Sequence, residues 1–245
     1  MISIIIATYN AEKFIDLTLN SLQNQKNKKF EVIIVDAVSK DNTLKIVNKY
    51  PNLVKKIISE YDSGIYDAWN KGIKLAKYNW IMFLGAGDTL FTNAIEIYLT
   101  HINKFDDSFD YISSKIYRVD NNENILSIIG KEWKWKEFCK VMTVAHVGSL
   151  HNKKLFTDIG YFNTHYLICA DYDLLIRKKD KLKSYFINEF IGKMLVGGIS
   201  FSKKALVETA KIKFQHKSSS PFSIITIFIL QFIYLKTFFL RKNNV

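Results

Sequence analysis

The sequence has little cysteine and proline, shows no internal repeat and lacks a leader-like start. Its 245 residues include two cysteines, Cys139 and Cys169, whose spacing fits neither a disulfide framework nor a cysteine metal site. A reducing compartment is therefore expected. The apolar run 2–7 follows Met1 at once, without a basic stretch or a small-residue cleavage site, so no signal peptide is predicted. Pro51 and Pro221, the only prolines, are expected at boundaries between secondary-structure elements.

Acidic residues are also scarce compared with basic ones. Asp and Glu total 23 against 35 Lys and Arg, which gives a formal net charge of +12. This balance favours an anionic partner, either nucleic acid, a phosphate-bearing ligand or an acidic membrane surface. It is equally expected from drift in a proteome rich in Lys, Asn and Ile. With 48% hydrophobic residues the chain can bury a sizeable core, and global disorder is excluded.

The first 85 residues alternate short β-branched runs with helical stretches. The nearly continuous apolar runs predict buried strands, and the stretches between them predict helices. The strands are expected at 2–7, 30–35, 54–59 and 80–84, and the helices at 10–25, 39–49 and 65–75, with Asn10 capping the first. This order predicts a parallel, doubly wound sheet, in which ligands bind beyond the carboxyl ends of the strands.

The second half of the chain is less regular. A strand is predicted at 111–118, and a Trp-rich basic segment covers 132–141. Short helices are expected at 153–160 and 170–179, and a polar basic linker at 211–220. The apolar stretch 221–240 carries a narrow polar stripe, which suits a helix lying in a membrane interface. Packing on the domain or on a second copy in a homo-oligomer stays open, and a true span is the least favoured alternative.

Polar residues follow the predicted strands, where a ligand would bind. Asp36 could accept hydrogen bonds from a base or a ribose, or could simply cap the next helix. Asp62-Ser63-Gly64 exposes a helix N-terminus suited to an anion, and Lys71 could face a phosphate, although a capped surface helix explains both. Gly85 and Gly87 allow close backbone approach to a ligand. Asp88 could ligate Mg²⁺ or Mn²⁺ beside a pyrophosphate.

Two carboxylates, Asp171 and Asp173, lie at a predicted helix start further along the chain. Acidic residues favour helix N-termini in any case, and the functional alternative is a general base. His146 and His151 are too loosely placed to predict a metal site.

Taken together, these segments resemble family 2 of the inverting glycosyltransferases. Residues 4–10 are similar to the opening strand and nucleotide loop of that family, and 32–36 with 39–43 to its second strand and base-binding aspartate. Residues 62–72 match a subgroup that builds bacterial surface polysaccharides, 83–88 occupy the place of its DxD metal motif, and 170–173 with Arg177 that of its Glu-Asp motif. Two departures stand out: glycine at 85 and 87, where many relatives are acidic or Asn, and alanine at 170.

The resemblance implies the GT-A fold, a Rossmann-like, mostly parallel α/β sheet flanked by helices, followed by a C-terminal apolar amphipathic helix. The GT-A domain is expected at 1–217, with a nucleotide-binding half at 1–92 and an acceptor half at 93–217, and the membrane or interface helix at 218–245. Asp171, with Asp173, is implied as the catalytic base and Asp88 as the ligand of Mn²⁺ or Mg²⁺. The implied donor-binding residues are Thr8, Tyr9, Asn10, Asp36, Asp62, Asn70, Lys71, Gly85, Ala86 and Gly87, and the implied acceptor side is formed by Trp133, Trp135, His146 and Arg177.

The activity implied is transfer of a sugar, with inversion, from a nucleotide-diphosphate sugar, UDP-linked by expectation, to a glycan or lipid-linked hydroxyl. The enzyme would be peripheral on the inner face of the plasma membrane, in contact with its anionic surface. One alternative is a sugar-nucleotide nucleotidyltransferase, but the loop Thr8-Tyr9-Asn10-Ala11 lacks the Gly-rich, basic character expected there. Another is a nucleic-acid-binding protein, for which 133–136 is the only aromatic and basic cluster, so no nucleic-acid partner is expected.

Overall fold

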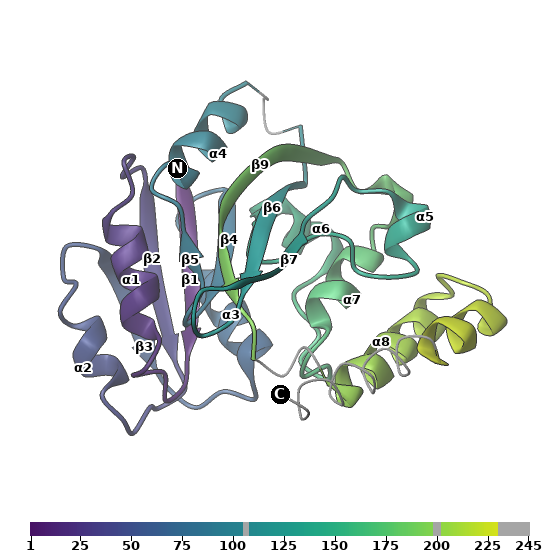
Figure 1. The fold of residues 1–245 in the computed structure, drawn as a ribbon, viewed down its shortest axis with the longest axis horizontal. Helices are drawn as coiled ribbons and strands as arrows, with labels where there is room; N and C mark the ends of the chain where they lie inside the picture. The colour runs from purple at the N-terminus through teal and green to yellow at the C-terminus, as the bar shows by residue number, and fades with distance from the viewer. Residues whose placement is uncertain (105–107, 198–201, 230–245) are drawn as a thin grey trace.

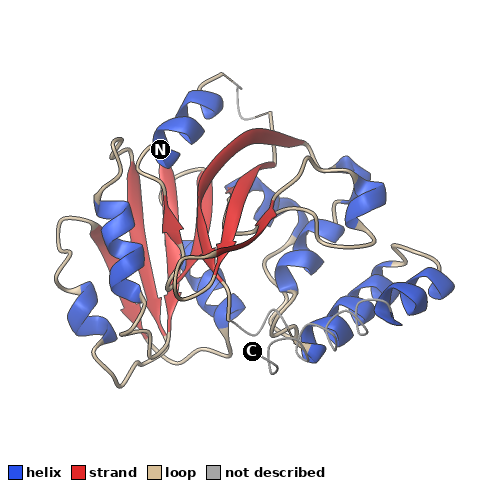
Figure 2. Ribbon diagram, viewed as in Figure 1, coloured by secondary structure: helices blue, strands red, loops and turns tan. Residues whose placement is uncertain are grey.

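A single mixed β-sheet runs through the molecule, with helices on both of its faces (Figures 1 and 2). The computed structural model describes residues 1–104, 108–197 and 202–229. Within these ranges the sheet has nine strands in the order β3-β2-β1-β4-β8-β6-β9-β5, and β7 pairs with β6. The predicted α/β class is therefore confirmed.

The first half of the chain forms the parallel part of the sheet. The strands are β1 (Ile2–Thr8), β2 (Phe30–Asp36), β3 (Val54–Ser59) and β4 (Trp80–Gly85), and the pairings among these four are all parallel. The helices between them are α1 (Ile15–Gln23), α2 (Thr43–Val47) and α3 (Ile65–Leu75). The β-branched runs of β1 and β2 are buried on both faces, as expected for parallel strands covered by crossover helices.

Alternate residues of β1 feed two separate core layers. Ile4 and Ile6 belong to the layer that contains α1 and α4, whereas Ile5 belongs to the layer of α3, α6 and α7. Helix α3 lies so close to the sheet that a Cβ added at Gly72 would stand 2.4 Å from the Cγ2 of Ile5. The absence of a side chain at Gly72 thus sets how closely α3 packs.

The second half continues the same sheet with antiparallel pairings. Strand β8 pairs antiparallel with both β4 and β6, and the long β9 pairs parallel with β6 and antiparallel with β5. The two halves therefore share one hydrogen-bonded sheet. The elements are β5 (Thr89–Leu90), α4 (Ala94–Ile102), β6 (Tyr111–Val119), β7 (Ile125–Ile129), α5 (Trp135–Phe138), β8 (Ser149–Asn152), α6 (Lys153–Ile159), α7 (Ala170–Ile176), a 3-10 turn (Lys179–Lys181), β9 (Ser184–Leu195) and α8 (Lys203–His216).

Two predictions from local pattern are wrong in their boundaries. Helix α1 begins at Ile15 rather than at Asn10, because Asn10 has a left-handed backbone (φ 47°) and bonds the loop after β2. The supposed linker 211–220 is mostly helical, since α8 runs to His216. Its basic residues misled the prediction: Ile212 and Lys213 are in fact buried.

The C-terminal segment is described only in part. Residues 221–229 are helical, and the remainder of the predicted apolar helix, 230–240, lies outside the described residues. Among the described helices, none is both long and apolar enough to cross a bilayer.

Candidate functional site

A cleft of about 550 Å³ opens at the carboxyl ends of β1 and β2, beside the start of α3. Two tyrosines stand at it with most of their surface free, Tyr9 at 66% and Tyr61 at 82% exposure. Exposed aromatic faces suit stacking on a nucleobase. The cleft is lined by Ala7, Thr8, Tyr9, Ala37, Val38, Lys40, Tyr61, Asp62, Gly64 and Ile65.

The two loops that border the cleft are tied to each other. The N–H of Asn10 donates to the Oγ of Ser39 at 2.9 Å, and the Oδ1 of Asn10 accepts from the N–H of Lys40 at 2.9 Å. Val38 is held at a positive φ of 57°, a conformation that costs free energy for a β-branched residue. The hydrogen bonds between the two loops offset that cost and hold this wall of the cleft in place.

Asp36 organises this wall from below. Its Oδ1 accepts from the hydroxyls of Thr8 at 2.9 Å and Ser39 at 2.5 Å. Its Oδ2 accepts from the N–H of Ser39 at 2.9 Å and the hydroxyl of Ser59 at 2.8 Å. The carboxylate is fully buried, so the residues after it, Ala37 and Val38, reach the cleft instead.

The motif at the start of α3 is engaged within the protein. Asp62 accepts the N–H of Gly64 at 2.9 Å, and burial raises the pKa of Asp62 above its ordinary value. The Oδ2 of Asp67 accepts the N–H of Ser63 at 3.0 Å, so the helix N-terminus already holds a carboxylate. Lys71 pairs with Glu60 at 3.0 Å.

Asn70 and Lys71 were predicted to bind the donor, but the structure gives their side chains internal partners. The amide of Asn70 makes two bonds to the backbone of Phe162, at 2.9 and 3.0 Å. Besides its ion pair, Lys71 donates to the carbonyl of Tyr61 at 2.6 Å. These contacts fix α3 to the segment at Tyr61, which lines the cleft, and to the loop at Phe162.

The loop after β4 presents the predicted metal ligand. Asp88 is buried, its Oδ2 accepts the N–H of Gly85 at 2.8 Å, and its Oδ1 accepts the N–H of Leu195 at 3.3 Å. Burial raises the pKa of Asp88 to about 7. Gly87, with φ 103°, turns the backbone, and the preceding residue Ala86 packs partly on the core. No cluster of three or more metal-ligating side chains occurs among the described residues.

Asp171 is half-buried in the first turn of α7. Its Oδ1 accepts from the hydroxyl of Tyr66 at 3.1 Å and from the N–H of Tyr172 at 2.9 Å. The other oxygen has no hydrogen-bond partner within the described part of the chain. Burial raises the pKa of Asp171 to about 6, near the value suited to a general base at neutral pH.

Asp173, two residues on, is placed differently. Its carboxylate is 2% exposed and accepts from Arg177 on one side and from the Nε2 of His216, at 2.8 Å, on the other. Arg177 also donates to the carbonyls of Ile159 at 3.0 Å and Tyr161 at 2.8 Å. Both predicted site residues of this pair, Asp173 and Arg177, are thus bound into the scaffold.

The aromatic residues predicted for the acceptor side pack against other side chains of the protein. His146 stacks on Trp69, with ring centroids 4.7 Å apart, and burial lowers the pKa of His146 to about 3, which keeps it neutral. Trp133 packs against Phe138 at 4.2 Å, and Trp135 borders the same core layer. These three residues do not line the cleft.

Sequence reasoning missed two residues whose side chains bond the segment that leads into α7. Tyr66 lies inside the 62–72 motif, but only its polar neighbours were singled out. Glu208 on α8 accepts the N–H groups of residues 167–169, at 2.9 to 3.0 Å. The signal for Tyr66 was its place in the first turn of α3, whereas no local pattern pointed to Glu208.

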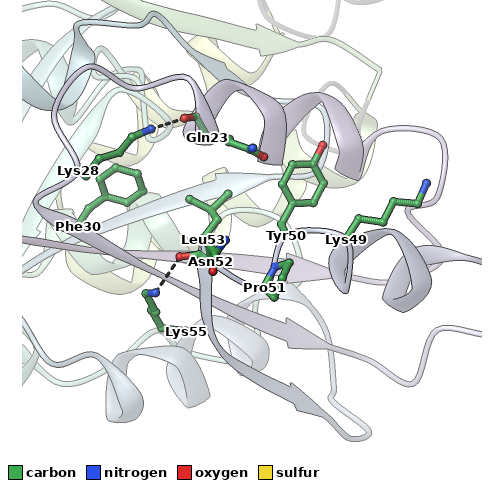
Figure 3. A pocket seen from close by; sticks show the side chains of 9 residues that line it. All are labelled: Gln23, Lys28, Phe30, Lys49, Tyr50, Pro51, Asn52, Leu53 and Lys55. Atoms are coloured by element: carbon green, nitrogen blue, oxygen red, sulfur yellow. Dashed lines mark hydrogen bonds between the residues drawn. The ribbon is translucent and has the colours of Figure 1, made fainter.

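A second cavity, of about 400 Å³, lies at the opposite end of the sheet (Figure 3). Lys28, Lys49 and Lys55 line it, together with aromatic and apolar side chains. The ammonium groups of Lys28 and Lys55 donate to the backbone carbonyls of Gln23 and Asn52. Because it lies near the amino ends of β2 and β3, this cavity is remote from the strand ends where ligands of such sheets bind.

Comparison with solved structures confirms the fold. The chain matches Staphylococcus aureus TarS in complex with UDP with a TM-score of 0.70 and 21% identity, over 90% of this chain and 66% of that one. It matches a Pyrobaculum calidifontis mannosyltransferase in complex with GDP-Man and Mn²⁺ with a TM-score of 0.67 and 15% identity, over 96% and 69%. At these identities the likeness shows the fold, which is the one that the sequence resemblance implied.

Sequence comparison gives the family. A PGL/p-HBAD biosynthesis glycosyltransferase of Mycobacterium bovis is 32% identical over 181 residues, which cover 72% of this chain and 69% of the relative. An Escherichia coli UDP-Glc:α-D-GlcNAc-diphosphoundecaprenol β-1,3-glucosyltransferase is 32% identical over 132 residues, or 54% and 50%. The family model described as glycosyl transferase family 2 matches residues 3–166. The chain therefore belongs to glycosyl transferase family 2.

Proposed function

We propose that this protein transfers a sugar, with inversion, from a nucleotide-diphosphate sugar to a hydroxyl of a cell-surface glycan or a lipid-linked acceptor. Family membership supports a glycosyltransferase in general, and the finer statement depends on the site. The observation that carries it is Asp171, a half-buried carboxylate with one unengaged oxygen, which is linked to the donor-side cleft through Tyr66. Tyr66 joins the two, because it bonds Asp171 and lies in the same turn as Ile65 of the cleft wall.

Asp171 would act as the general base. An acceptor hydroxyl is a poor nucleophile at neutral pH, so a positioned carboxylate must take its proton as the bond to the anomeric carbon forms. The raised pKa of Asp171, about 6, leaves the side chain ionised at neutral pH but basic enough to accept that proton. Attack from the face opposite the leaving nucleoside diphosphate inverts the anomeric carbon.

The cleft would hold the nucleotide. Tyr9 and Tyr61 offer stacking faces, and Lys40 adds a positive charge at the same wall. Thr8 and Asp62 line the cleft as well, in keeping with the predicted donor-binding set. UDP is favoured as the carrier because S. aureus TarS is described in complexes with UDP and UDP-GlcNAc.

The residues present fit a divalent cation with one protein carboxylate. Mg²⁺ and Mn²⁺ are commonly held by one or two carboxylates together with substrate phosphates and water, so Asp88 suffices as the protein ligand. Asp88 is buried, no cationic side chain of the described residues is bound to it, and a metal ion would offset its charge. When bound, such an ion neutralises charge on the departing diphosphate.

Residues 221–229 would bring the enzyme to the inner face of the plasma membrane. Phe222 is 81% exposed, and Ile225 and Ile229 are each about half exposed on this helical segment. Exposed apolar side chains beside a strongly basic chain suit binding to an anionic lipid surface. Phe222→Ser with Ile225→Ser should weaken flotation with phosphatidylglycerol vesicles, whereas Ile57→Ser, at an exposed strand edge, should not. Unchanged flotation of the double variant would rule out this contact.

The activity is tested with a panel of nucleotide sugars. The purified protein is incubated with UDP-, GDP- and dTDP-sugars, and release of the nucleoside diphosphate is measured with and without Mn²⁺. Slow hydrolysis of UDP-sugars is expected, and the anomeric configuration of the released sugar, read by NMR before mutarotation, should be inverted.

Asp171→Asn should bind the same donor without turning it over, and Asp180→Asn, at an exposed position in the 3-10 turn after α7, is the matched control. Release of pyrophosphate from a nucleoside triphosphate and a sugar 1-phosphate, in place of donor hydrolysis, would instead identify a nucleotidyltransferase. Retained configuration would overturn inversion alone.

A further inference from the structure

Helix α8 packs directly on the segment that leads into α7. Ser202 caps α8 by accepting the N–H of Ala205 at 3.3 Å, and Ala205 in turn is buried against the second core layer. The thiol of Cys169, which stands just before α7, donates to the carbonyl of Ala205 at 3.4 Å. Figure 1 shows the two helices as neighbours in the lower right of the molecule. One face of α8 therefore looks onto the backbone before Asp171.

Glu208 projects from that face onto three consecutive backbone N–H groups. Its Oε1 accepts from Leu167 at 3.0 Å, and its Oε2 accepts from Ile168 at 2.9 Å and Cys169 at 3.0 Å. Cys169 is the N-cap of α7 and makes no side-chain cap of its own. Glu208 thus supplies, from a different helix, an acceptor for the N–H of the N-cap residue and for those of the two residues before it.

The opposite side of the same backbone is held by Tyr66. Its hydroxyl lies 2.5 Å from the carbonyl of Ile168 and 3.1 Å from the Oδ1 of Asp171. Residues 167–169 are therefore clamped between Glu208 on α8 and Tyr66 on α3. Leu167 also borders a small crevice with Gly64 and Ile65, which line the donor-side cleft.

We propose that Glu208 is a positioning residue of this enzyme: by fixing the backbone of residues 167–169 it sets where Asp171 presents its unengaged oxygen to the acceptor hydroxyl. This inference rests on the proposed role of Asp171 as base. Glu208 touches no substrate and acts through the polypeptide alone. A shift of about 1 Å in a reacting group can lower turnover by about a hundredfold. Loss of the contacts that hold residues 167–169 is therefore expected to lower turnover measurably.

Glu208 also acts on Asp171 through its charge. The pKa of Asp171 is raised chiefly by burial, and the negative charge of Glu208 adds to that rise. Replacing Glu208 by Gln removes the charge and turns a two-oxygen acceptor into one with a single oxygen, at almost the same volume. The pKa of Asp171 in Glu208→Gln should therefore lie lower than in the wild type.

The experiment measures position and ionisation before it measures activity. Hydrogen exchange of the full-length protein should show faster exchange of the amides of 167–169 in Glu208→Gln, with other amides unchanged. Carboxyl ¹³C NMR titration should show the lowered pKa of Asp171. Glu96→Gln, which removes one exposed first-turn carboxylate of α4, should change neither and serves as the charge-matched control.

Steady-state kinetics then separate positioning from binding. For Glu208→Gln, kcat should fall about tenfold or more while KM for the donor stays within about twofold, and the acid limb of the kcat profile should move to lower pH. Glu208→Asp, which keeps the charge on a shorter stem, should leave that limb in place. Normal exchange at 167–169, or a kcat loss that only follows the folded fraction, would overturn the proposal. An inactive wild type with altered exchange and pKa in Glu208→Gln would overturn the proposed function and leave the clamp standing.

Discussion

Two regions are each built around a buried carboxylate: the loops after β1 and β2, which border the cleft on the donor side, and the start of α7. The partners of the two carboxylates differ in chemical type and in the elements that supply them. Asp36 is satisfied by neutral groups of Thr8, Ser39 and Ser59, all on neighbouring parallel strands or the loops that follow them. Asp173 is satisfied by charged or chargeable side chains, Arg177 and His216, the latter on α8.

The difference teaches how each region keeps its shape. On the donor side the register of the sheet already brings the polar groups together, because parallel strands end at one edge. Around α7 no sheet register exists, and side chains from α3 and α8 hold the backbone in place. The following predictions test this contrast, from the largest expected effect to the smallest.

Asp171→Asn should lower turnover by at least about a hundredfold, since a general base contributes that much or more. Nucleotide binding, measured by calorimetry with UDP, should survive because the cleft belongs to the other region. The variant should be no less stable than the wild type at pH 8. The raised pKa of Asp171 means that the folded state binds the proton more tightly, so its ionisation weakens the fold as pH rises from about 4 to about 6. An active Asp171→Asn with an inactive Asp173→Asn would transfer the role of base to Asp173.

Asp173→Ala should lower the free energy of unfolding by about 3 kcal/mol, because it leaves Arg177 and His216 without their buried partner. Urea denaturation at pH 7 measures the change, and Asp180→Ala, at an exposed position, is the control. A loss below about 1 kcal/mol would show that the ion pairs around α7 contribute no more than exposed ones.

Gly72→Ala should destabilise the donor half by about 1–2 kcal/mol. The added methyl group would meet Ile5 at 2.4 Å, and the overpacking cost exceeds the gain of about 1 kcal/mol in helix propensity. Adding Gly72→Ala to an Ile5→Ala background should cost less than in the wild type, which a double-mutant cycle in urea detects. Equal costs in both backgrounds would mean that α3 does not press on β1.

Tyr66→Phe should leave the rate at pH 8 within about twofold and move the acid limb of the rate profile to higher pH. The hydroxyl of Tyr66 stabilises ionised Asp171, so its loss raises the pKa of Asp171, and the base is protonated at a higher pH. A pH series of initial rates reads the shift, with Tyr161→Phe as the control. A limb that moves to lower pH would contradict the bond to Asp171.

Much of the donor side could be predicted from the sequence because it is encoded locally. The strands predicted at 2–7, 30–35 and 80–84 agree with β1, β2 and β4 to within one residue, and α3 was also predicted. Thr8, Tyr9 and Asp62, which were predicted to bind the donor, line the cleft. Asn70 and Lys71 show the limit of prediction from motifs. The residue type at a motif position does not indicate which groups its side chain contacts in the fold.

The α7 region could be predicted only in outline. The helix was expected from 170, but its clamp joins Tyr66 to Asp171 across 105 positions and Glu208 to Leu167 across 41. Contacts between residues so far apart leave no periodic pattern in the sequence. The basic composition of 211–220 also concealed the end of α8, since Lys213 is buried and donates to the carbonyl of Lys140 at 2.5 Å.

The hydrogen bond between Leu195 and Asp88 has a consequence for folding of the chain during its synthesis on the ribosome. Asp88 leaves the ribosome 107 positions before the N–H that holds its Oδ1. At a synthesis rate of about 5–20 residues per second, that delay is about 5–20 s. During this time the parallel strands can already form, while the carboxylate of Asp88 has only Gly85 as a backbone partner among the described residues. The nascent chain should therefore form the cleft at the ends of β1 and β2 first and complete the contacts of Asp88 last, when β9 joins β6 and β5.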